Sequence, residues 1–294
     1  MSVIEFAKYN QAWFLGNITL DIYGEIPGDW THEFFAPFQT KSICFGGKAM
    51  NVAFHFAQLV GNSNYGGVVG TDFDKIGYRD YCLTHRINIE KALQLDTPTP
   101  VFQVIVCEKQ KRILYPYVEI QPDLYSKIQK HYSDLIGKSE NSIIYLTFES
   151  LDKYQNDLTF AKNRGCLIAW NPILVATELD MNLLDVVDIL FINSTESKRL
   201  FPRSDLRHIS KTTSTIIQVT DNENDVQAFI NGKQFSVPTY PPKMIIDGTG
   251  AGDSFAACVL SEIFKSSCLN IPDSIKLANK YATKILENYG AQHL

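Results

Sequence analysis

The sequence of 294 residues lacks several features that mark membrane, secreted and nucleic-acid-binding proteins. No apolar run approaches the ~18 residues that a membrane-spanning helix needs. Residues 1–10 contain Glu5 and Lys8 and no long apolar core, which argues against a signal peptide. The six cysteines include no C-x-x-C pair, which favours reduced thiols over disulfides or zinc and predicts a cytoplasmic protein.

The sequence also lacks an excess of positive charge and internal repeats. A net charge of −5 argues against a basic surface for nucleic acid and favours small-molecule partners. The chain has no charge run, low-complexity segment or repeat of fixed period, which argues against repeat architectures and disorder. What it does have is apolar content: 45% of the residues are hydrophobic and 12% aromatic, enough for a substantial core. We expect a single large domain over residues 1–294.

Strands and helices alternate regularly in the C-terminal half. The predicted strands cover residues 142–146, 166–170, 187–192 and 215–220, with helices from 150, near 181–184 and from 195. A hairpin over 226–230 and 234–237 turns at Asn231-Gly232. Alternation of this kind predicts the α/β class, with a central, mostly parallel sheet flanked by helices on both faces.

The N-terminal half is less regular. Strands are predicted at residues 11–16 and 65–70, followed by a helix from Thr71 to about Arg86 that Asp72 and Asp74 cap. The segment 22–44 is rich in glycine, proline and aromatic residues, which fits neither a central strand nor a helix. Residues 101–107 and 112–117 alternate apolar and polar side chains and predict another hairpin.

The most informative stretch is Asp-Gly-Thr-Gly-Ala-Gly-Asp-Ser-Phe at residues 247–255. Its glycines precede an apolar run at helical spacing, which predicts a loop that becomes a helix N-terminus. The unpaired N–H groups there suit phosphate. A carboxylate beside an anion site is unfavourable unless it accepts a proton, so Asp253 is a candidate general base. The alternative is an ordinary glycine-rich turn in which Asp253 only complements the helix dipole.

A second glycine-rich element, Cys-Phe-Gly-Gly-Lys-Ala-Met-Asn, covers residues 44–51. Gly46 and Gly47 allow a ligand to approach the backbone, and Lys48 and Asn51 offer polar groups from the first turn of a predicted helix. The alternative is a common strand-to-helix turn with a solvated lysine.

Polar residues also follow the predicted strands. The carboxyl ends of parallel strands form the ligand crevice, so Asp21, which follows the first strand, could bind hydroxyl groups there. Asn193-Ser194-Thr195-Glu196 follows the 187–192 strand, where Glu196 could hold hydrated Mg²⁺. The alternative for Asn193 and Glu196 is a self-sufficient capping box.

These motifs together resemble the ribokinase-like (PfkB) carbohydrate kinase family. Residues 247–253 are similar to its D-T-x-G-A-G-D signature, residues 46–51 to its G-G-K-x-x-N element, and residues 193–196 to its N-x-x-E element, all in the family's order. The resemblance covers nearly the whole chain. It implies a ribokinase-like fold with a small β lid, formed by residues of about 18–45 and 98–118, that shields the substrate.

The resemblance also implies a role for each matching residue. Asp253 would be the base, Gly250, Ala251 and Gly252 the phosphate cradle, and Glu196 a Mg²⁺ ligand. Substrate contacts would come from Asn17, Asp21, Gly46, Gly47, Lys48, Asn51 and Glu149. Nucleotide contacts would come from Asn193, Thr220, Asn222, Gly250, Gly252 and Asn279. Asn171 would be a further neighbour of the substrate or phosphate.

The sequence departs from the family pattern in three places. Gly248 replaces the usual Thr, and Ile173 replaces an Arg that often contacts phosphate. The 221–225 loop lacks the family's usual glycines: Asn222 can adopt left-handed geometry, and Asp225 adds negative charge near the expected nucleotide.

We therefore expect an ATP- and Mg²⁺-dependent kinase acting on a primary hydroxyl of a furanose sugar such as ribose or fructose. A nucleoside kinase acting on an adenosine-like substrate is the nearest alternative. A non-catalytic sugar- or nucleoside-binding relative is the alternative from another class. No nucleic-acid or membrane partner is expected, and a homodimer through an open lid edge is compatible with the sequence.

Overall fold

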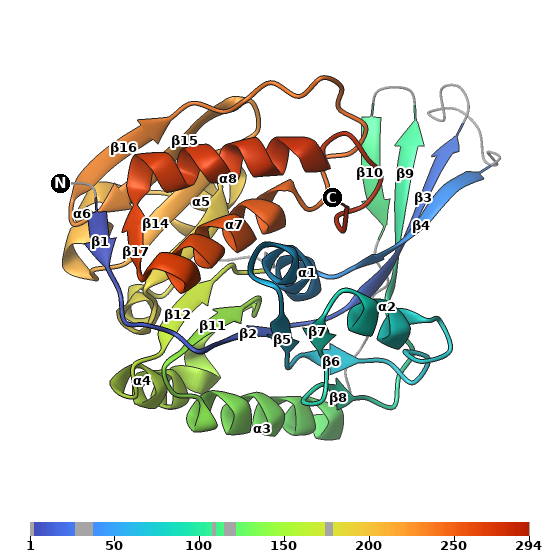
Figure 1. The fold of residues 1–294 in the computed structure, drawn as a ribbon, viewed down its shortest axis with the longest axis horizontal. Helices are drawn as coiled ribbons and strands as arrows, with labels where there is room; N and C mark the ends of the chain where they lie inside the picture. Colours follow the sequence, from blue (N-terminus) through green and yellow to red (C-terminus); the bar gives the residue numbers. More distant parts are fainter. Residues whose placement is uncertain (1–2, 27–37, 108–109, 115–121, 174–178, 294) are drawn as a thin grey trace.

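A computed structural model describes the chain except for residues 1–2, 27–37, 108–109, 115–121, 174–178 and 294 (Figure 1). Among the described residues, nine strands form the main sheet in the order β16-β15-β14-β13-β12-β11-β2-β5-β7. The strands from β7 to β14 run parallel, and β15 and β16 add an antiparallel hairpin at one edge. This is the predicted α/β architecture.

The strand bounds follow the buried apolar runs of the sequence. They are β2 (Gln11–Leu15), β5 (Ser63–Tyr65), β7 (Ile87–Asn88), β11 (Ser142–Leu146), β12 (Leu167–Trp170), β13 (Ile189–Asn193), β14 (Ile216–Asp221), β15 (Asn224–Ile230) and β16 (Lys233–Val237). All five residues of β11 are buried, because a parallel strand in the middle of a sheet is covered on both faces. The β15–β16 hairpin turns at Asn231 and Gly232, both with positive φ, as predicted.

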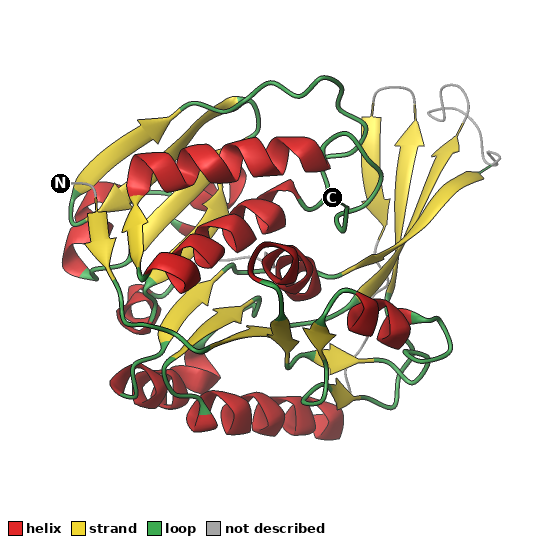
Figure 2. Cartoon of the chain, viewed as in Figure 1, coloured by secondary structure: helices red, strands yellow, loops and turns green. Residues whose placement is uncertain are grey.

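Helices cover both faces of the main sheet (Figure 2). One face carries α1 (Lys48–Val60), α7 (Ala251–Ser266) and α8 (Ile271–Ile285), and α7 packs between the other two. The opposite face carries α3 (Pro122–Lys138), α4 (Gln155–Asn163), α5 (Ser194–Leu200) and α6 (Leu206–Thr212). Alternate residues of β11 divide between the two cores: Tyr145 faces α1 and α7, while Ile144 faces α3 and α4.

A second sheet of four strands projects from one end of this body (Figures 1 and 2). Its order is β10-β9-β3-β4, with β3 (Thr19–Ile26), β4 (Gln39–Gly46), β9 (Val101–Cys107) and β10 (Gln110–Leu114). These strands come from the segments predicted for the lid, of which residues 27–37, 108–109 and 115–118 lie outside the described residues.

Two short strand pairs complete the described sheets. β1 (Val3–Glu5) pairs antiparallel with β17 (Cys268–Asn270), and β6 (Val68–Val69) pairs parallel with β8 (Leu93–Gln94). The cysteines whose side chains are described are all free thiols. None of the described helices is long and apolar enough to cross a membrane.

Several element predictions were wrong in detail. The strand expected at residues 65–70 is divided between β5 and β6. The helix expected from Thr71 begins only at Tyr78 as α2 (Tyr78–Thr84), after Gly77 with φ 79°. Asp72 therefore caps no helix; its Oδ1 accepts hydrogen bonds from Thr99 N at 2.8 Å and Thr99 Oγ1 at 2.7 Å.

Other helix predictions also need correction. Asp74 forms an ion pair with Arg79 at 2.5 Å instead of capping the expected helix. The helix predicted from residue 150 begins with a 3₁₀ turn, η1 (Asp152–Tyr154), and the one near 181–184 is a 3₁₀ helix, η2 (Met181–Val186). Helix α3 was not predicted at all.

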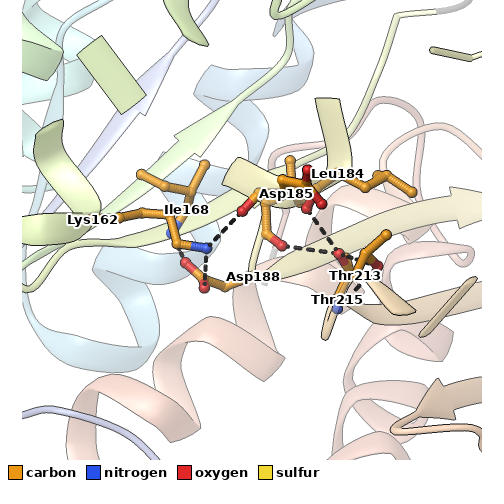
Figure 3. A network of polar contacts seen from close by, with 8 residues as sticks. Lys162, Ile168, Leu184, Asp185, Asp188, Thr213 and Thr215 are labelled. Atoms are coloured by element: carbon orange, nitrogen blue, oxygen red, sulfur yellow. Dashed lines mark hydrogen bonds and ion pairs between the residues drawn. The ribbon is translucent and has the colours of Figure 1, made fainter. Parts of the chain in front are cut away.

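A polar network fixes the amino ends of the central strands (Figure 3). Asp188 Oδ2 accepts from Ile168 N at 2.7 Å, and its Oδ1 pairs with Lys162 Nζ at 2.9 Å. Thr215 Oγ1 lies 3.1 Å from both Leu184 O and Val187 O. This network joins the beginnings of β12, β13 and β14, at the opposite end of these strands from Asn171 and Asn193.

Candidate active site

The glycine-rich loop leads directly into α7. Gly250 is the N-cap residue with φ 82°, a conformation that glycine adopts without the strain of a Cβ. A Cβ on Gly250 would lie 2.6 Å from Ala291 Cα, so the close packing of residue 291 also requires glycine. At Gly252, in contrast, an added Cβ would have no heavy atom within 4 Å apart from the adjoining residues and the backbone of its own helix. The start of α7 therefore presents N–H groups beside open space, which suits an anion.

Asp247 holds this loop in shape. Its Oδ1 accepts from Thr249 N at 3.1 Å and from Thr249 Oγ1 at 2.9 Å. Its Oδ2 accepts from Gly290 N at 3.1 Å, which ties the loop to the C-terminal segment. Gly248 is exposed and has open space around its Cβ position, so the missing Thr side chain leaves no packing defect.

Asp253 is buried in the first turn of α7, with 6% of its surface exposed. Its Oδ2 accepts a hydrogen bond from Asn51 Nδ2 at 2.8 Å. Burial raises the pKa of Asp253, against the opposing effects of the Lys48 charge and the Asn51 hydrogen bond, and Glu196 raises it further. A buried carboxylate with a raised pKa beside an anion site has the properties of a proton acceptor.

Lys48 connects three elements at the same place. It is the first residue of α1, and its Nζ donates to Asn171 Oδ1 at 2.5 Å, just beyond β12. The same Nζ lies 3.6 Å from Glu196 Oε1 in α5. Lys48 thus contacts both Asn171 and Glu196, and Asn51 contacts Asp253, so Lys48, Asn51, Asn171, Glu196 and Asp253 form one polar cluster near the carboxyl ends of the strands.

The two glycines before α1 make room for the second sheet. Gly47 has φ 107°, and a Cβ there would lie 2.7 Å from Ile18 Cα. A Cβ on Gly46 would lie 2.6 Å from Thr19 Oγ1 and also collide with the carboxylate of Asp21. Asp21 is buried and accepts from Thr19 Oγ1 at 2.8 Å. The approach of the backbone at Gly46 therefore fixes the position of the Asp21 carboxylate.

Glu196 belongs to a complete capping box. Its N–H donates to Asn193 Oδ1, and its Oε2 accepts from Asn193 N, both at 2.8 Å. The capping alternative is therefore present in the structure. It occupies only one carboxylate oxygen, because Oε1 faces Lys48, so capping and a place in the polar cluster coexist. Among the described residues, no group of three or more His, Cys, Asp or Glu side chains could hold a metal on its own.

The residues expected near a nucleotide come from several elements, and the structure describes a contact or backbone conformation for each of the following. Thr220 is paired with Asn193 across β13 and β14, and Asn222 has φ 48°, the left-handed geometry expected of it. Asn279 is buried in α8 and donates to Pro238 O at 2.9 Å. Asp225 accepts from Ser236 Oγ at 2.6 Å, which holds its carboxylate on the β15–β16 hairpin.

Two expected substrate residues have no described contact with the polar cluster. Asn17 and Glu149 are exposed. Ile173, at the position of the family's frequent arginine, is 38% exposed. Sequence reasoning also missed Gln292, which donates to Asn51 Oδ1 at 3.0 Å. No motif marks Gln292, because it reaches the cluster only through the fold.

Fold and polar cluster together are those of an α/β protein with a buried carboxylate, Asp253, at a glycine-rich helix start. A model of the pfkB family carbohydrate kinases matches residues 38–294. The chain belongs to this family and is a kinase that phosphorylates a hydroxyl group of a sugar or nucleoside. The expected ribokinase-like fold is confirmed.

Two relatives and a further solved structure illustrate this similarity. A ribokinase of Lactococcus lactis is 28% identical over 252 residues, covering 84% of this chain and 81% of the relative. A nucleoside kinase of Methanocaldococcus jannaschii is 24% identical over 231 residues, covering 75% and 72%. Its crystal structure has a TM-score of 0.78 at 20% identity, covering 97% and 94%. A putative ribokinase II from E. coli, in complex with ATP and Mg²⁺, has a TM-score of 0.75 at 16% identity, covering 96% and 94%.

Proposed function

We propose that the protein transfers the γ-phosphoryl group of ATP to a primary hydroxyl of a furanose sugar, with Asp253 as general base. The observation that carries this proposal is the buried Asp253 carboxylate, oriented by Asn51, in the helix turn that Gly250 begins. A base in this position can take the hydroxyl proton while the hydroxyl oxygen attacks phosphorus.

The reaction balances within this arrangement. The acceptor oxygen forms a bond to the γ-phosphorus, the bond from γ-phosphorus to the bridging oxygen breaks, and ADP leaves. The proton of the acceptor hydroxyl passes to Asp253. The N–H groups of Gly250, Ala251 and Gly252 would stabilise charge on the transferring group, since donors fixed in advance need no rearrangement during the reaction.

Substrate and nucleotide would approach from opposite sides of Asp253. On the substrate side, Asp21 and Asn51 would bind sugar hydroxyls, with Asn17, Gly46, Gly47, Lys48 and Glu149 as the further contacts inferred from the family motifs. On the nucleotide side, Asn193, Thr220, Asn222 and Asn279 would border the ATP. Because Ser236 holds the Asp225 carboxylate, that charge has a fixed place on the hairpin.

Glu196 fits a role in binding Mg²⁺. This ion usually binds one or two carboxylates together with waters and substrate phosphates, so it needs no cage of protein ligands. When bound, it would neutralise charge on the phosphates of ATP. Glu196 Oε1 is the oxygen in question, because Oε2 is engaged by Asn193 N.

A nucleoside such as adenosine is the second candidate substrate. It is favoured by the similarity to the nucleoside kinase of Methanocaldococcus jannaschii and to a Burkholderia thailandensis nucleoside kinase solved with inosine. A panel of sugars and nucleosides, tested for ADP release with ATP and Mg²⁺, separates the two substrate classes. Stabilisation by a sugar in thermal-shift titration, without ADP release or a response to ATP and Mg²⁺, would instead indicate a non-catalytic binding protein.

The role of Asp253 is tested by Asp253→Asn. We expect turnover to fall by about a hundredfold or more, as on loss of a positioned base, while ligand binding is largely retained. Asp134→Asn, at an exposed position on α3 of the opposite face, is the matched control and should keep full turnover. Turnover of Asp253→Asn equal to that of the parent would refute the assignment.

Association of two copies through the second sheet is also part of the proposal. Strand β4 is an edge of that sheet, and its Ile43 is 61% exposed. An unpaired edge of this kind can add a strand from another copy. Light scattering on the purified protein tests this, and a monomer at all working concentrations would contradict it.

A further inference from the structure

Gln292 lies behind the proposed base, two hydrogen bonds away from it. Its Nε2 donates to Asn51 Oδ1 at 3.0 Å, and Asn51 Nδ2 in turn donates to Asp253 Oδ2 at 2.8 Å. All three side chains are buried, with 8% of Gln292, 4% of Asn51 and 6% of Asp253 exposed. Water therefore has little access to replace these bonds.

The order of donors and acceptors along these two hydrogen bonds determines which way the Asn51 amide is turned. An asparagine side chain donates hydrogen bonds through its NH₂ group and accepts them through its carbonyl oxygen, so it can bind a carboxylate only through the NH₂ group. Gln292 presents an NH₂ group to Asn51, so the oxygen of Asn51 turns toward Gln292 and its nitrogen toward Asp253. With Asn51 reversed, its oxygen would face a carboxylate oxygen and the hydrogen bond would be lost.

Gln292 is itself fixed in orientation. Tyr78 OH donates to Gly46 O at 2.7 Å, so the Tyr78 oxygen is an acceptor for Gln292 Nε2 at 3.2 Å. Both hydrogens of the Gln292 NH₂ group therefore have acceptors, Asn51 and Tyr78. A reversed Gln292 would place its oxygen against the oxygen of Asn51.

The backbone beside Gln292 is also held in place. Gly290 N donates to Asp247 in the glycine-rich loop, and Ala291 packs against Gly250. Ala291 O lies 2.7 Å from His55 Nε2, and burial lowers the pKa of His55 to about 4. A neutral imidazole with its proton on Nε2 donates to this carbonyl. Residues 290–292 thus connect the phosphate loop with α1.

We propose that Gln292 is a positioning residue for phosphoryl transfer: it orients Asn51 so that the Asn51 amide holds the Asp253 carboxylate toward the acceptor hydroxyl. This inference rests on the proposed role of Asp253 as base. Gln292 itself acts only through Asn51, so it is distinct from the residues that would touch substrate.

Loss of Gln292 has a directional effect on Asp253. The Asn51 hydrogen bond lowers the pKa of Asp253, so a freely rotating Asn51 lets that pKa rise. Within the described part of the chain, Lys48 from α1, Glu196 from α5 and Tyr145 from β11 also interact electrostatically with Asp253, and none of them is altered by the change. Because the base acts in its ionised form, the acidic limb of the activity profile should move to higher pH.

The test uses Gln292→Leu, which keeps the bulk but removes the donor. We expect kcat to fall about tenfold, comparable to the loss of one hydrogen bond to a charged group, with the KM for ATP nearly unchanged. The acidic limb of kcat/KM should move to higher pH. Gln58→Leu is the matched control, because Gln58 lies on the same helix as Asn51 but contacts His85, and it should behave like the parent.

Gln292→Glu separates positioning from packing. Glutamate has nearly the shape of glutamine, but its ionised side chain only accepts hydrogen bonds, so Asn51 would turn its NH₂ group toward residue 292 and away from Asp253. Positioning predicts that this variant is at least as impaired as Gln292→Leu. Thermal melting of both variants checks that they are folded. Full activity in a folded Gln292→Glu protein would overturn the proposal.

A measurement without turnover keeps this inference separate from the proposed function. Titration of the Asp253 carboxyl carbon by ¹³C NMR, with the signal assigned by its loss in Asp253→Asn, reports the ionisation directly. A midpoint that is higher in Gln292→Leu than in the parent supports positioning, even if no sugar or nucleoside is phosphorylated. Coinciding midpoints refute it, even if the parent is an active kinase.

Discussion

Replacing Gly250 and Gly252 separately by alanine should separate two effects of the glycine-rich loop before α7: its contribution to folding and its proposed contribution to anion binding. At Gly250 an alanine must adopt φ 82°, which costs ~1–2 kcal/mol. Its Cβ would also lie 2.6 Å from Ala291 Cα, an overpacked contact that costs ~1–3 kcal/mol. We expect Gly250→Ala to lose about 2–5 kcal/mol of unfolding free energy, or on the order of 10 °C in melting temperature.

Gly252→Ala has none of these costs. Apart from the adjoining residues and the backbone of its own helix, the added methyl group meets no heavy atom within 4 Å, and alanine favours a helix by up to ~1 kcal/mol over glycine. Its melting temperature should therefore equal or exceed that of the parent. Turnover should nevertheless fall, because the methyl group occupies the open space that a phosphate would enter.

The assay combines chemical denaturation with ADP release on both variants. A Gly252→Ala protein with the parent's turnover and KM for ATP would refute the assignment of the anion site to this turn. A Gly250→Ala protein as stable as the parent would refute the argument from Ala291.

Three further predictions concern the polar cluster and the polar network at the amino ends of the central strands. Because burial raises the pKa of Asp253, its ionised carboxylate destabilises the fold at neutral pH. The Asp253→Asn protein should therefore have a higher melting temperature than the parent at pH 7. This difference should vanish below about pH 4, where the carboxyl group is protonated in the folded and the unfolded protein. A constant difference across pH would contradict this. Lys48→Met removes a cation that lowers that pKa, so the acidic limb of kcat/KM should move to higher pH; an unmoved limb would show that Lys48 does not act on the base. Asp188→Ala leaves Ile168 N without its hydrogen-bond partner, so the free energy of unfolding in urea should fall by ~1–3 kcal/mol. Turnover of the folded protein should be unchanged. Reduced turnover would show that the amino ends of the central strands are coupled to the polar cluster at their carboxyl ends.

Much of the fold could be predicted because its signals are local. A buried run such as residues 142–146 predicts a strand wherever it lies, and Asn231-Gly232 predicts a hairpin turn. The errors arose where a local pattern had two solutions. Residues 71–77 resemble a capped helix start, but Gly77 takes a left-handed conformation and the helix begins after it. Gly66-Gly67 interrupt what otherwise resembles a single strand.

In the candidate site, too, residues in local motifs could be predicted and residues placed only by the fold could not. Asp253, Lys48, Asn51 and Glu196 were predicted because each lies in a short motif, and the structure brings them together. Gln292 could not be predicted, since its contact with Asn51 joins residues that are far apart in the sequence. Its place depends on how residues 290–292 return to α1 after α8, which no local pattern specifies.

The pairing of β1 with β17 has a consequence for how the protein forms. Val3 lies opposite Asn270, so β1 finds its partner only after more than 260 further residues have been synthesised. Contacts of such long sequence separation slow folding, because the loop must close before the contact stabilises it. A nascent chain on the ribosome therefore carries β1 unpaired until residues 268–270 have emerged.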